Sequence, residues 1–323
     1  DMVIGSGSTL SITNNTENAY HVFITSGLDS TTLIDGFTVE GGNADGSSTI
    51  SYDGSDFFRF EGGGMFNYDS SPSVINTTFS GNSANFGGGG MFNYDSSPSV
   101  INSTFSRNSV DFGGGGMYNV LSSPNIINTT FSGNEADFGG GGMYNESSSP
   151  NIINTTFSGN EADYGGGMYS ENSSPSISNT TFSENEATTQ GGGMYNDNSS
   201  PIINNTVFYR NTAATEPDIR GTIDTSSSHN ASDGSGGSIS SGTPFIDLNG
   251  VASNDLFVNA SDPEGPDGIW RTADDGLIPA VGSDLIDSGN NDQLPADTTD
   301  LDGDGNTAEE IPYDSTGAAR IFG

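Results

Sequence analysis

Apolar and polar positions along the middle of this chain follow one short pattern that returns at a fixed interval. In each copy a glycine run leads into Met and an aromatic residue, a Pro precedes a mostly β-branched pair, and a Phe follows. Successive copies are 26 residues apart, with a single step of 25. The two most regular columns are Met65, Met91, Met117, Met143, Met168 and Met194, and Phe79, Phe105, Phe131, Phe157, Phe182 and Phe208. Because one period contains no helix-forming stretch, each copy becomes stable only by stacking on its neighbours, which predicts a β-solenoid.

The order of apolar positions within a copy predicts which side chains face the core. The second residue after each Pro is apolar in all six copies, as at Val100, and we expect it to point inward together with the Met column. Five residues separate Val100 from Phe105, and strict alternation cannot bury both ends of an odd interval without a bend. We place the bend at a shared Asn, because Asn tolerates unusual backbone angles. We expect hydrogen-bonded ladders along this Asn file and along a second one, comprising Asn76, Asn102, Asn128, Asn154, Asn179 and Asn205, and Asn82, Asn108, Asn134, Asn160, Asn185 and Asn211.

The residue after each Met is aromatic, and alternation turns its side chain outward. The glycines before the Met provide a tight turn. An outward aromatic file could form a platform on which sugar rings stack, or its rings could stack on one another. The file consists of Phe66, Phe92, Tyr118, Tyr144, Tyr169 and Tyr195.

The segments on either side of the regular copies are less periodic. Phe37 resembles the first member of the Phe column, and the long interval to Phe79 predicts a loop or an extra strand between Asn43 and Glu61. After Thr215 the repeat gives way to Ser, Gly, Asp and Pro. We therefore divide the chain into a parallel β-helix at 1–225 and an irregular C-terminal segment at 226–323 that packs on the last coils.

Charge and composition restrict the possible partners. The chain has 323 residues, 42 acidic residues against six Arg, no Lys, no Cys and a formal net charge of −36. Such a surface repels phosphates and anionic lipids, so we expect neither nucleic-acid binding nor membrane insertion. The absence of Cys excludes disulfides and thiolate metal sites. Strong acidity with abundant Ser, Thr, Asn and Gly favours an extracellular or cell-surface location, and Asp1 opens the chain without a signal peptide.

The acidic tail predicts a calcium site. Oxygen ligands at alternate positions, with a Gly for the sharp turn, suit a hard cation such as Ca²⁺. Ile311 stands where a helix-loop-helix calcium loop would have its last Glu, so we expect a loop without flanking helices. The candidate ligands are Asp300, Asp302, Asp304, Asn306, Glu309 and Glu310, and a second, more loosely spaced cluster contains Asp262, Glu264, Asp267, Asp274 and Asp275.

Two carboxylate files also recur with the repeat. Their like charges repel one another at one-rung spacing by roughly 1 kcal/mol per pair even in water, so we expect them to be solvated or bridged by cations. Glycoside hydrolysis uses two carboxylates in different environments, which a file of near-identical groups does not provide. The chain also lacks the paired basic residues that a polysaccharide lyase needs, and His21 and His229 lie at opposite ends. The files consist of Asp111, Asp137 and Asp163, and of Glu135, Glu161 and Glu186.

The repeats resemble those of a known family. The pairing of Gly88-Gly89-Gly90-Met91 with Phe105-Ser106-Arg107-Asn108 is similar to the repeats of polymorphic outer-membrane autotransporters, whose passenger domains are right-handed parallel β-helices. The tail is similar to secreted bacterial β-helix proteins of the choice-of-anchor Q type. The similar tail segments are Asp255-Leu256-Phe257-Val258, the stretch 267–277, and Ile286-Asp287-Ser288-Gly289. The resemblance implies an exported cell-surface or matrix component.

These observations lead to one main hypothesis and one alternative. The main hypothesis is an all-β, right-handed parallel β-helix without catalytic activity, a structural or adhesive element of a cell surface, matrix or filament that Ca²⁺ stabilises. Eight or nine coils would form a rod on the order of 40 Å long. Its open ends favour association with itself, end to end or laterally. The alternative is a carbohydrate-active enzyme or carbohydrate-binding module, with glycans as partners.

Overall fold

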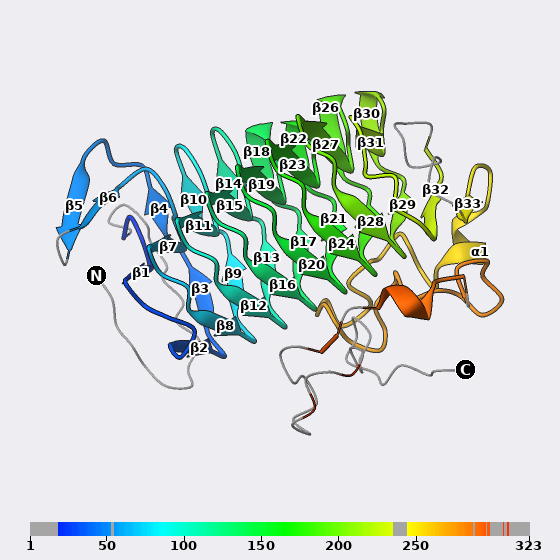
Figure 1. The fold of residues 1–323 in the computed structure, drawn as a ribbon, viewed down its shortest axis with the longest axis horizontal. Helices are drawn as coiled ribbons and strands as arrows, with labels where there is room; N and C mark the ends of the chain where they lie inside the picture. The colour runs from blue at the N-terminus through cyan, green and yellow to red at the C-terminus, as the bar shows by residue number, and fades with distance from the viewer. Residues whose placement is uncertain are drawn as a thin grey trace.

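Parallel strands wound around one axis make up most of the molecule. The computed structural model describes residues 19–52, 55–234, 244–286, 288–294 and 296–297, together with Asn306 and Glu309. Each coil contributes one strand to each of four sheets, and the coils stack along the axis (Figure 1). Met91 pairs in register with Met65 and Met117, so the recurring unit is one full turn of a right-handed parallel β-helix. The predicted fold class is confirmed.

Sheet A carries the Met column, and sheet B follows it in each coil. The eight described strands of sheet A place its first and last strands about 34 Å apart at the usual strand spacing. Sheet A consists of β1 (Phe23–Ser26), β7 (Met65–Tyr68), β11 (Met91–Tyr94), β15 (Met117–Val120), β19 (Met143–Glu146), β23 (Met168–Glu171), β27 (Met194–Asp197) and β31 (Ile219–Arg220). Sheet B consists of β2 (Leu33–Asp35), β8 (Ser73–Ile75), β12 (Ser99–Ile101), β16 (Asn125–Ile127), β20 (Asn151–Ile153), β24 (Ser176–Ser178) and β28 (Ile202–Asn204).

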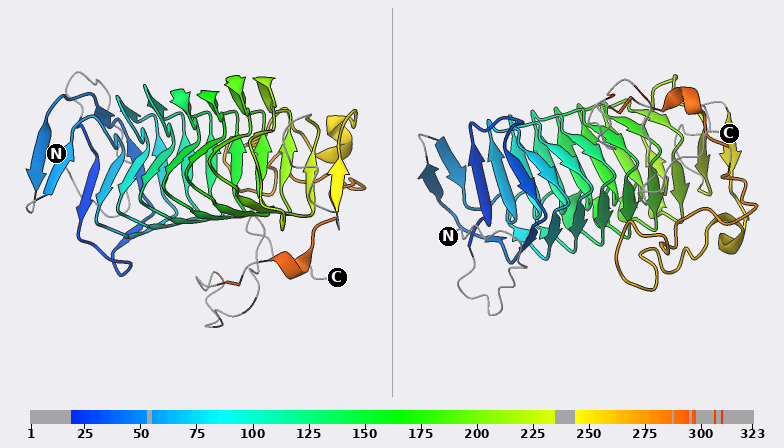
Figure 2. Two further views of the ribbon diagram at one scale, coloured as in Figure 1. Left: turned by 45° about the horizontal axis from the view of Figure 1, so that its top comes forward. Right: turned by 90° about the horizontal axis from the view of Figure 1, so that it is seen from below.

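Sheet C carries the Phe column, and sheet D leads from it back to the glycine run. Sheet C consists of β3 (Thr38–Glu40), β9 (Thr78–Ser80), β13 (Thr104–Ser106), β17 (Thr130–Ser132), β21 (Thr156–Ser158), β25 (Thr181–Ser183), β29 (Val207–Tyr209), β32 (Asn230–Ser232) and β33 (Phe245–Asp247). Sheet D consists of β4 (Asn43–Ala44), β10 (Ser83–Ala84), β14 (Ser109–Val110), β18 (Glu135–Gly139), β22 (Glu161–Tyr164), β26 (Glu186–Gln190) and β30 (Thr212–Thr215). Figure 2 shows these strands stacked along the rod from two further directions.

The core inside the coils is a narrow stack of three apolar files. The Met column, the Phe column and the apolar position after each Pro are fully buried and form one continuous cluster. Neighbouring Phe rings lie parallel, as for Phe182 and Phe208 at 4.8 Å. Three large apolar side chains per coil are enough for this cluster because the backbone groups of each coil bond to the coils above and below.

The two predicted turn positions have the expected backbone angles. Each shared Asn between sheets B and C is in the left-handed region, for example Asn102 with φ 50°. This bend lets Val100 and Phe105 both face inward despite their odd spacing. Gly114, before Met117, has φ 70° and closes the turn from sheet D into sheet A.

The N-terminal coil differs from the others in two respects. An antiparallel hairpin of β5 (Thr49–Tyr52) and β6 (Ser55–Phe58) occupies the interval where the sequence predicted an extra strand. The expectation for Phe37 is wrong, because Val39 pairs in register with Phe79 and is fully buried. Phe37 instead packs against the end of the core next to Phe23.

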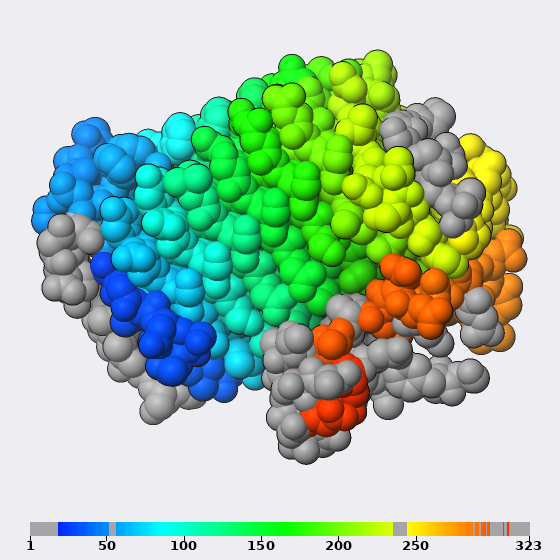
Figure 3. All heavy atoms as spheres, viewed as in Figure 1, coloured from blue at the N-terminus to red at the C-terminus, as the bar shows by residue number. Residues whose placement is uncertain are grey.

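The C-terminal segment packs along one side of the last coils. Sheet C continues for two strands beyond residue 225, through β32 and β33. After them come the short helix α1 (Ser253–Leu256), a series of turns, and the 3₁₀ helix η2 (Asn291–Gln293). Figure 3 shows the atoms of this segment (orange) against the coils rather than separate from them.

Candidate functional site

A cleft lies where the C-terminal segment crosses the bend between sheets B and C. Its volume is about 290 Å³. One wall is built from repeat positions, including the bend residues Asn154, Asn179 and Asn205, and the other from the C-terminal segment. The remaining lining residues are Thr180, Thr181, Thr206, Val207, His229, Ala231, Ile246, Phe257, Leu277, Pro279, Leu285, Ser288, Gly289, Asn290 and Leu294.

An apolar contact and a pair of hydrogen bonds hold the C-terminal segment beside the cleft. Tyr209 replaces the outward Ser of the preceding copies and packs on Phe257 at 5.3 Å, within a small core that includes Leu248 and Leu256. The side-chain amide of Asn205 accepts from the backbone N–H of Asn290 at 2.8 Å and donates to its carbonyl at 3.1 Å. The Asn205 amide thus makes the two hydrogen bonds to the Asn290 backbone that a neighbouring strand would make.

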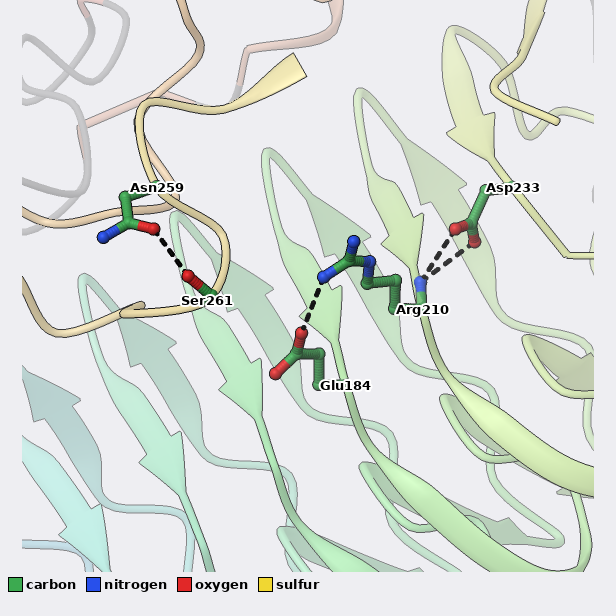
Figure 4. Close-up of polar contacts among 5 residues, drawn as sticks. All are labelled: Glu184, Arg210, Asp233, Asn259 and Ser261. Carbon is green, nitrogen blue, oxygen red and sulfur yellow. Dashed lines mark hydrogen bonds and ion pairs between the residues drawn. The ribbon is translucent and has the colours of Figure 1, made fainter. Parts of the chain in front are cut away.

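Charged groups gather around Arg210, which directly follows β29 (Figure 4). The guanidinium of Arg210 lies 3.4 Å from the carboxylate of Glu184 and 5.2 Å from the Tyr209 ring centroid. The Arg210 backbone N–H donates to both carboxylate oxygens of Asp233, at 3.0 and 3.1 Å. Burial raises the pKa of Asp233 to about 6, and the nearby charge of Asp218 adds to the rise. None of these charged residues is among the described residues that line the cleft.

The chemistry available in the cleft is that of neutral polar groups. Of the lining residues that the structure describes, His229 alone has a titratable side chain, and its Nδ1 lies 3.0 Å from the Ser228 hydroxyl. The hydroxyls of Thr180 and Thr206 donate to carbonyls two residues earlier, at 3.0 and 2.9 Å. Among the described residues that line the cleft there is no carboxylate, so these residues do not supply the paired acid and base that hydrolysis of a glycosidic bond requires.

Four of the predicted calcium ligands form part of the turns after residue 260. The buried Asp275 carboxylate accepts the backbone N–H groups of Arg271 and Thr272, at 2.8 and 3.1 Å. Asp267 accepts the N–H of Ile269 at 2.8 Å, and Asp274 accepts the Thr272 hydroxyl at 2.6 Å. Asp262 bonds to Asn259 through its backbone.

The other predicted ligands lie around residue 305. Asp300, Asp302, Asp304 and Glu310 lie outside the described residues, whereas the Asn306 amide donates to Glu309 at 3.1 Å. Across the part of the chain that the structure describes, no three acidic or His side chains are grouped so that they could hold a metal ion. Calcium binding therefore stays a prediction for both clusters.

The repeated carboxylates lie on the outer face of sheet D. Glu135, Glu161 and Glu186 are in register on neighbouring strands and are exposed, as are Asp111, Asp137 and Asp163. The Thr188 hydroxyl donates to Asp163 and continues this file by one coil. The predicted acidic face is thus exposed, and its solvation or bridging by cations stays a prediction.

The aromatic file beside the Met column is not available to a ligand. Phe66, Phe92, Tyr118 and Tyr144 are at most 2% exposed, because sheet D folds back and lays a second aromatic file over them. Rings of the first file contact one another, as Tyr144 and Tyr169 do at 4.7 Å. The sugar-platform hypothesis for this file is therefore wrong, and the self-stacking alternative holds. The covering file consists of Phe86, Phe112, Phe138 and Tyr164.

The structure contains a third amide ladder that the sequence reasoning missed. Asn67, Asn93, Asn119 and Asn145 are fully buried on sheet A, and each amide donates to the next at 2.7 to 2.9 Å. The signal was the Asn two positions after the Met in five of the six copies, which has the same parity as the Met itself.

The predicted second Asn ladder is confirmed along its whole length and ends on a carboxylate. Each Asn donates to the next one, as Asn134 does to Asn160 at 2.9 Å, and the last, Asn211, donates to Asp218. Ser232 and the backbone N–H of Gly234 also donate to Asp218. Burial raises the pKa of Asp218 although these three hydrogen bonds oppose the rise. In the bend file, by contrast, the described structure has one amide pair, between Asn154 and Asn128 at 3.0 Å.

Comparison with known proteins assigns neither a family nor a function to this chain. No protein-family model, curated protein or solved structure matches the chain. Among the described residues, no helix has the length and apolar character needed to cross a membrane.

Proposed function

We propose that this chain is a non-catalytic structural or adhesive element of an extracellular surface, matrix or filament. The observation that carries the proposal is how the repeated polar groups are used. Inside the coils, the Asn side chains of a file bond to one another from coil to coil. On the outside, the repeated carboxylates form a uniform exposed face. The described residues that line the cleft include no carboxylate. Function then resides in the shape of the rod and in its surface.

The finer parts of the proposal come from composition and resemblance. A chain without Lys and with a net charge of −36 stays soluble in saline surroundings and repels nucleic acid and anionic lipid. The resemblance to choice-of-anchor Q proteins and to autotransporter repeats supports export to a cell surface. Ca²⁺ would add stability by bridging carboxylates in the C-terminal segment. Partners would include further copies of the chain, meeting at the strand edges of the two ends.

A screen of the soluble chain against neutral and acidic polysaccharides tests the absence of catalysis. We expect no new reducing ends and no unsaturated products after prolonged incubation. Turnover that is lost in His229→Ala would overturn the proposal and favour an enzyme that uses the cleft. Saturable binding without turnover, lost in Asn179→Ala but kept in a matched surface variant such as Asn151→Ala, would favour a carbohydrate-binding module instead.

Self-association is tested separately by sedimentation over a wide range of protein concentration. We expect the average mass to rise with concentration, because an open strand edge favours pairing with another edge. A Pro in the terminal strand β30, such as Ala213→Pro, removes a backbone donor from that edge and should reduce the rise. A chain that stays monomeric at all concentrations would remove homotypic assembly from the proposal.

A further inference from the structure

Two titratable side chains are buried together in the first coil, at the opposite end of the molecule from the cleft. Glu61 is 7% exposed and His21 is 8% exposed. His21 lies 3.0 Å from the Gly62 carbonyl through Nδ1, so this nitrogen donates the hydrogen bond. Neither residue belongs to the repeat or takes part in the proposed function.

Glu61 occupies a register position that glycine holds in the following coils. It forms a parallel bridge with Gly87, which pairs with Gly113, and the file continues to Gly139. These glycines leave room for the aromatic file, since a Cβ on Gly87 would collide with the Tyr118 ring. At this register position the first coil has Glu61, whose carboxyl side chain lies where the following coils leave room for the aromatic file. Burial is the main cause that raises the pKa of Tyr118, and the charge of Glu61 adds to the rise.

The surroundings of the pair are mostly aromatic. The His21 ring meets the edge of Phe66 at 5.6 Å, and Phe66 meets the fully buried Phe57 at 5.2 Å. Nε2 of His21 is buried without a hydrogen-bond partner, and no described residue donates a hydrogen bond to the Glu61 carboxyl. These aromatic surroundings therefore favour the uncharged forms of His21 and Glu61.

Few charged groups face this pair. Arg59 lies on the hairpin side, where its guanidinium covers Tyr20 at 5.1 Å and its charge lowers the pKa of His21. Tyr118 approaches from β15, with its hydroxyl bonded to Glu146 at 2.5 Å. Burial raises the pKa of Glu61 to about 8 and lowers that of His21. Both groups are consequently uncharged near neutral pH.

We propose that the first coil and its hairpin, residues 19–52 and 55–61, form a pH-responsive cap that is closed while Glu61 and His21 are uncharged and opens when either becomes charged. Opening releases β1 to β4 from the strands below them. It thereby exposes the edges of β7, β8, β9 and β10, which are next in each sheet.

The two groups act over different pH ranges. In the open form Glu61 has its ordinary pKa of 4.5, so between pH 4.5 and about 8 the open form loses a proton that the closed form keeps, and opening increases. His21 has an ordinary pKa of 6.5, so below pH 6.5 the open form gains a proton that the closed form rejects. Protonation of His21 thus offsets part of the closing effect of Glu61 below pH 6.5. Above pH 6.5 the Glu61 effect acts alone, and the cap opens as the pH rises.

Hydrogen exchange of the full chain, analysed as protection factors so that the chemical exchange rate is removed, tests the cap. Amides of β1 to β6 are compared with those of β15 to β23 as an internal reference. Between pH 6.5 and 8.5 the opening constant of the cap should rise about tenfold, while the reference strands stay unchanged. Glu61→Gln should abolish this rise, and the opening constant should instead fall slightly over the same range.

His21→Asn keeps a donor for the Gly62 carbonyl but cannot become charged. This variant should retain the rise above pH 6.5, and below pH 6.5 its opening constant, relative to its own value at pH 8.5, should be lower than that of the wild-type chain, because the contribution of His21 protonation is removed. If Glu61→Gln does not fold, Glu61→Gly supplies the residue of the following coils and should show the same loss of the alkaline rise. A wild-type pH profile in the Glu61 and His21 variants, or equal opening of the reference strands, would overturn the proposal.

Discussion

At the scale of single residues, the coils depend on side chains that accept a left-handed backbone. The turn between sheets A and B contains such a residue in every regular copy, and in most copies it is Asp, Asn or Ser. Leu121 is the exception, with φ 52° and a side chain that is 57% exposed. Outside Gly, Asn and Asp, this conformation costs roughly 1–2 kcal/mol, and an exposed Leu recovers little of it by packing.

Leu121→Asn should therefore stabilise the protein. Asn occupies the same position at 172 and 198, and the gain in unfolding free energy should be about 0.5–1 kcal/mol. Denaturant unfolding monitored by circular dichroism measures it. Leu121→Ala keeps the strain and should bring no gain. An equal gain from Ala would mean that removal of an exposed apolar side chain, and not the backbone, is responsible.

The interior Asn side chains are required for their hydrogen bonds rather than for their backbone angles, because each amide bonds to several buried groups. Asn134 donates to the Phe105 carbonyl and to Asn160, and it accepts from the backbone and side chain of Asn108. Asn134→Ala leaves these buried groups without partners and should cost about 2–4 kcal/mol of unfolding free energy. The matched control is Asn151→Ala, since this exposed amide also donates to an Asn one coil away. Its loss should cost less than about 0.5 kcal/mol.

At the scale of elements, the glycine run sets how closely one coil approaches the next. A Cβ on Gly115 would lie 2.5 Å from the Glu135 carbonyl oxygen and 2.6 Å from that of Gly141, closer than van der Waals contact allows. A Cβ on Gly159, at the turn after sheet C, would meet nothing within 4 Å. The two glycines thus have different roles, one steric and one conformational, since Gly159 has φ 62°.

Gly115→Ala should be far more disruptive than Gly159→Ala. The first forces two coils apart and should cost more than about 3 kcal/mol, whereas the second should cost about 1 kcal/mol for a left-handed Ala. Thermal unfolding of both variants beside the wild-type chain makes the comparison. Similar losses in the two variants would show that the coils adjust their spacing without penalty.

The same elements show how far sequence reasoning reaches. Period and parity were sufficient for the coil, the inward Met and Phe columns and the bend at Asn102, because each follows from local geometry repeated six times. Parity also turned Phe92 outward, but it could not show that sheet D folds back to cover it. Phe37 was misassigned because the irregular first coil lacks the repeat that fixes register, and the pairing of Val39 with Phe79 appears only in three dimensions.

The candidate site was less predictable than the fold. The cleft joins Asn179 and Asn205 of the coils to Leu285 and Asn290 of the C-terminal segment, residues between 80 and 111 positions apart in sequence. No periodicity connects such residues. Glu61 was likewise read as the end of a loop, since its burial depends on the hairpin packed beside it.

At the scale of the whole molecule, contacts are made almost entirely between neighbouring coils. A solenoid of this kind has a stability close to the sum of its coils and of the interfaces between them. Superimposed on this sum is a net charge of −36, with Arg210–Glu184 and Arg220–Glu216 as the ion pairs in the described part. Like charges in register along sheet D repel one another over the length of the rod. Stability should therefore respond to ions in two separable ways, by screening and by specific binding.

Thermal unfolding in three media separates these two effects. Raising NaCl from about 10 mM to about 500 mM shortens the screening length from about 30 Å to below 10 Å, so the melting temperature should rise by several degrees in the wild-type chain. At fixed high NaCl, millimolar Ca²⁺ should raise it further and a chelator should reverse that second rise, because the acidic C-terminal segment supplies carboxylate oxygens for a hard cation. The double variant Asp302→Asn, Asp304→Asn should keep the response to NaCl and lose the response to Ca²⁺. A chelator without effect on the wild-type chain at high NaCl would mean that screening alone stabilises the rod, and the predicted calcium sites would then lose their support.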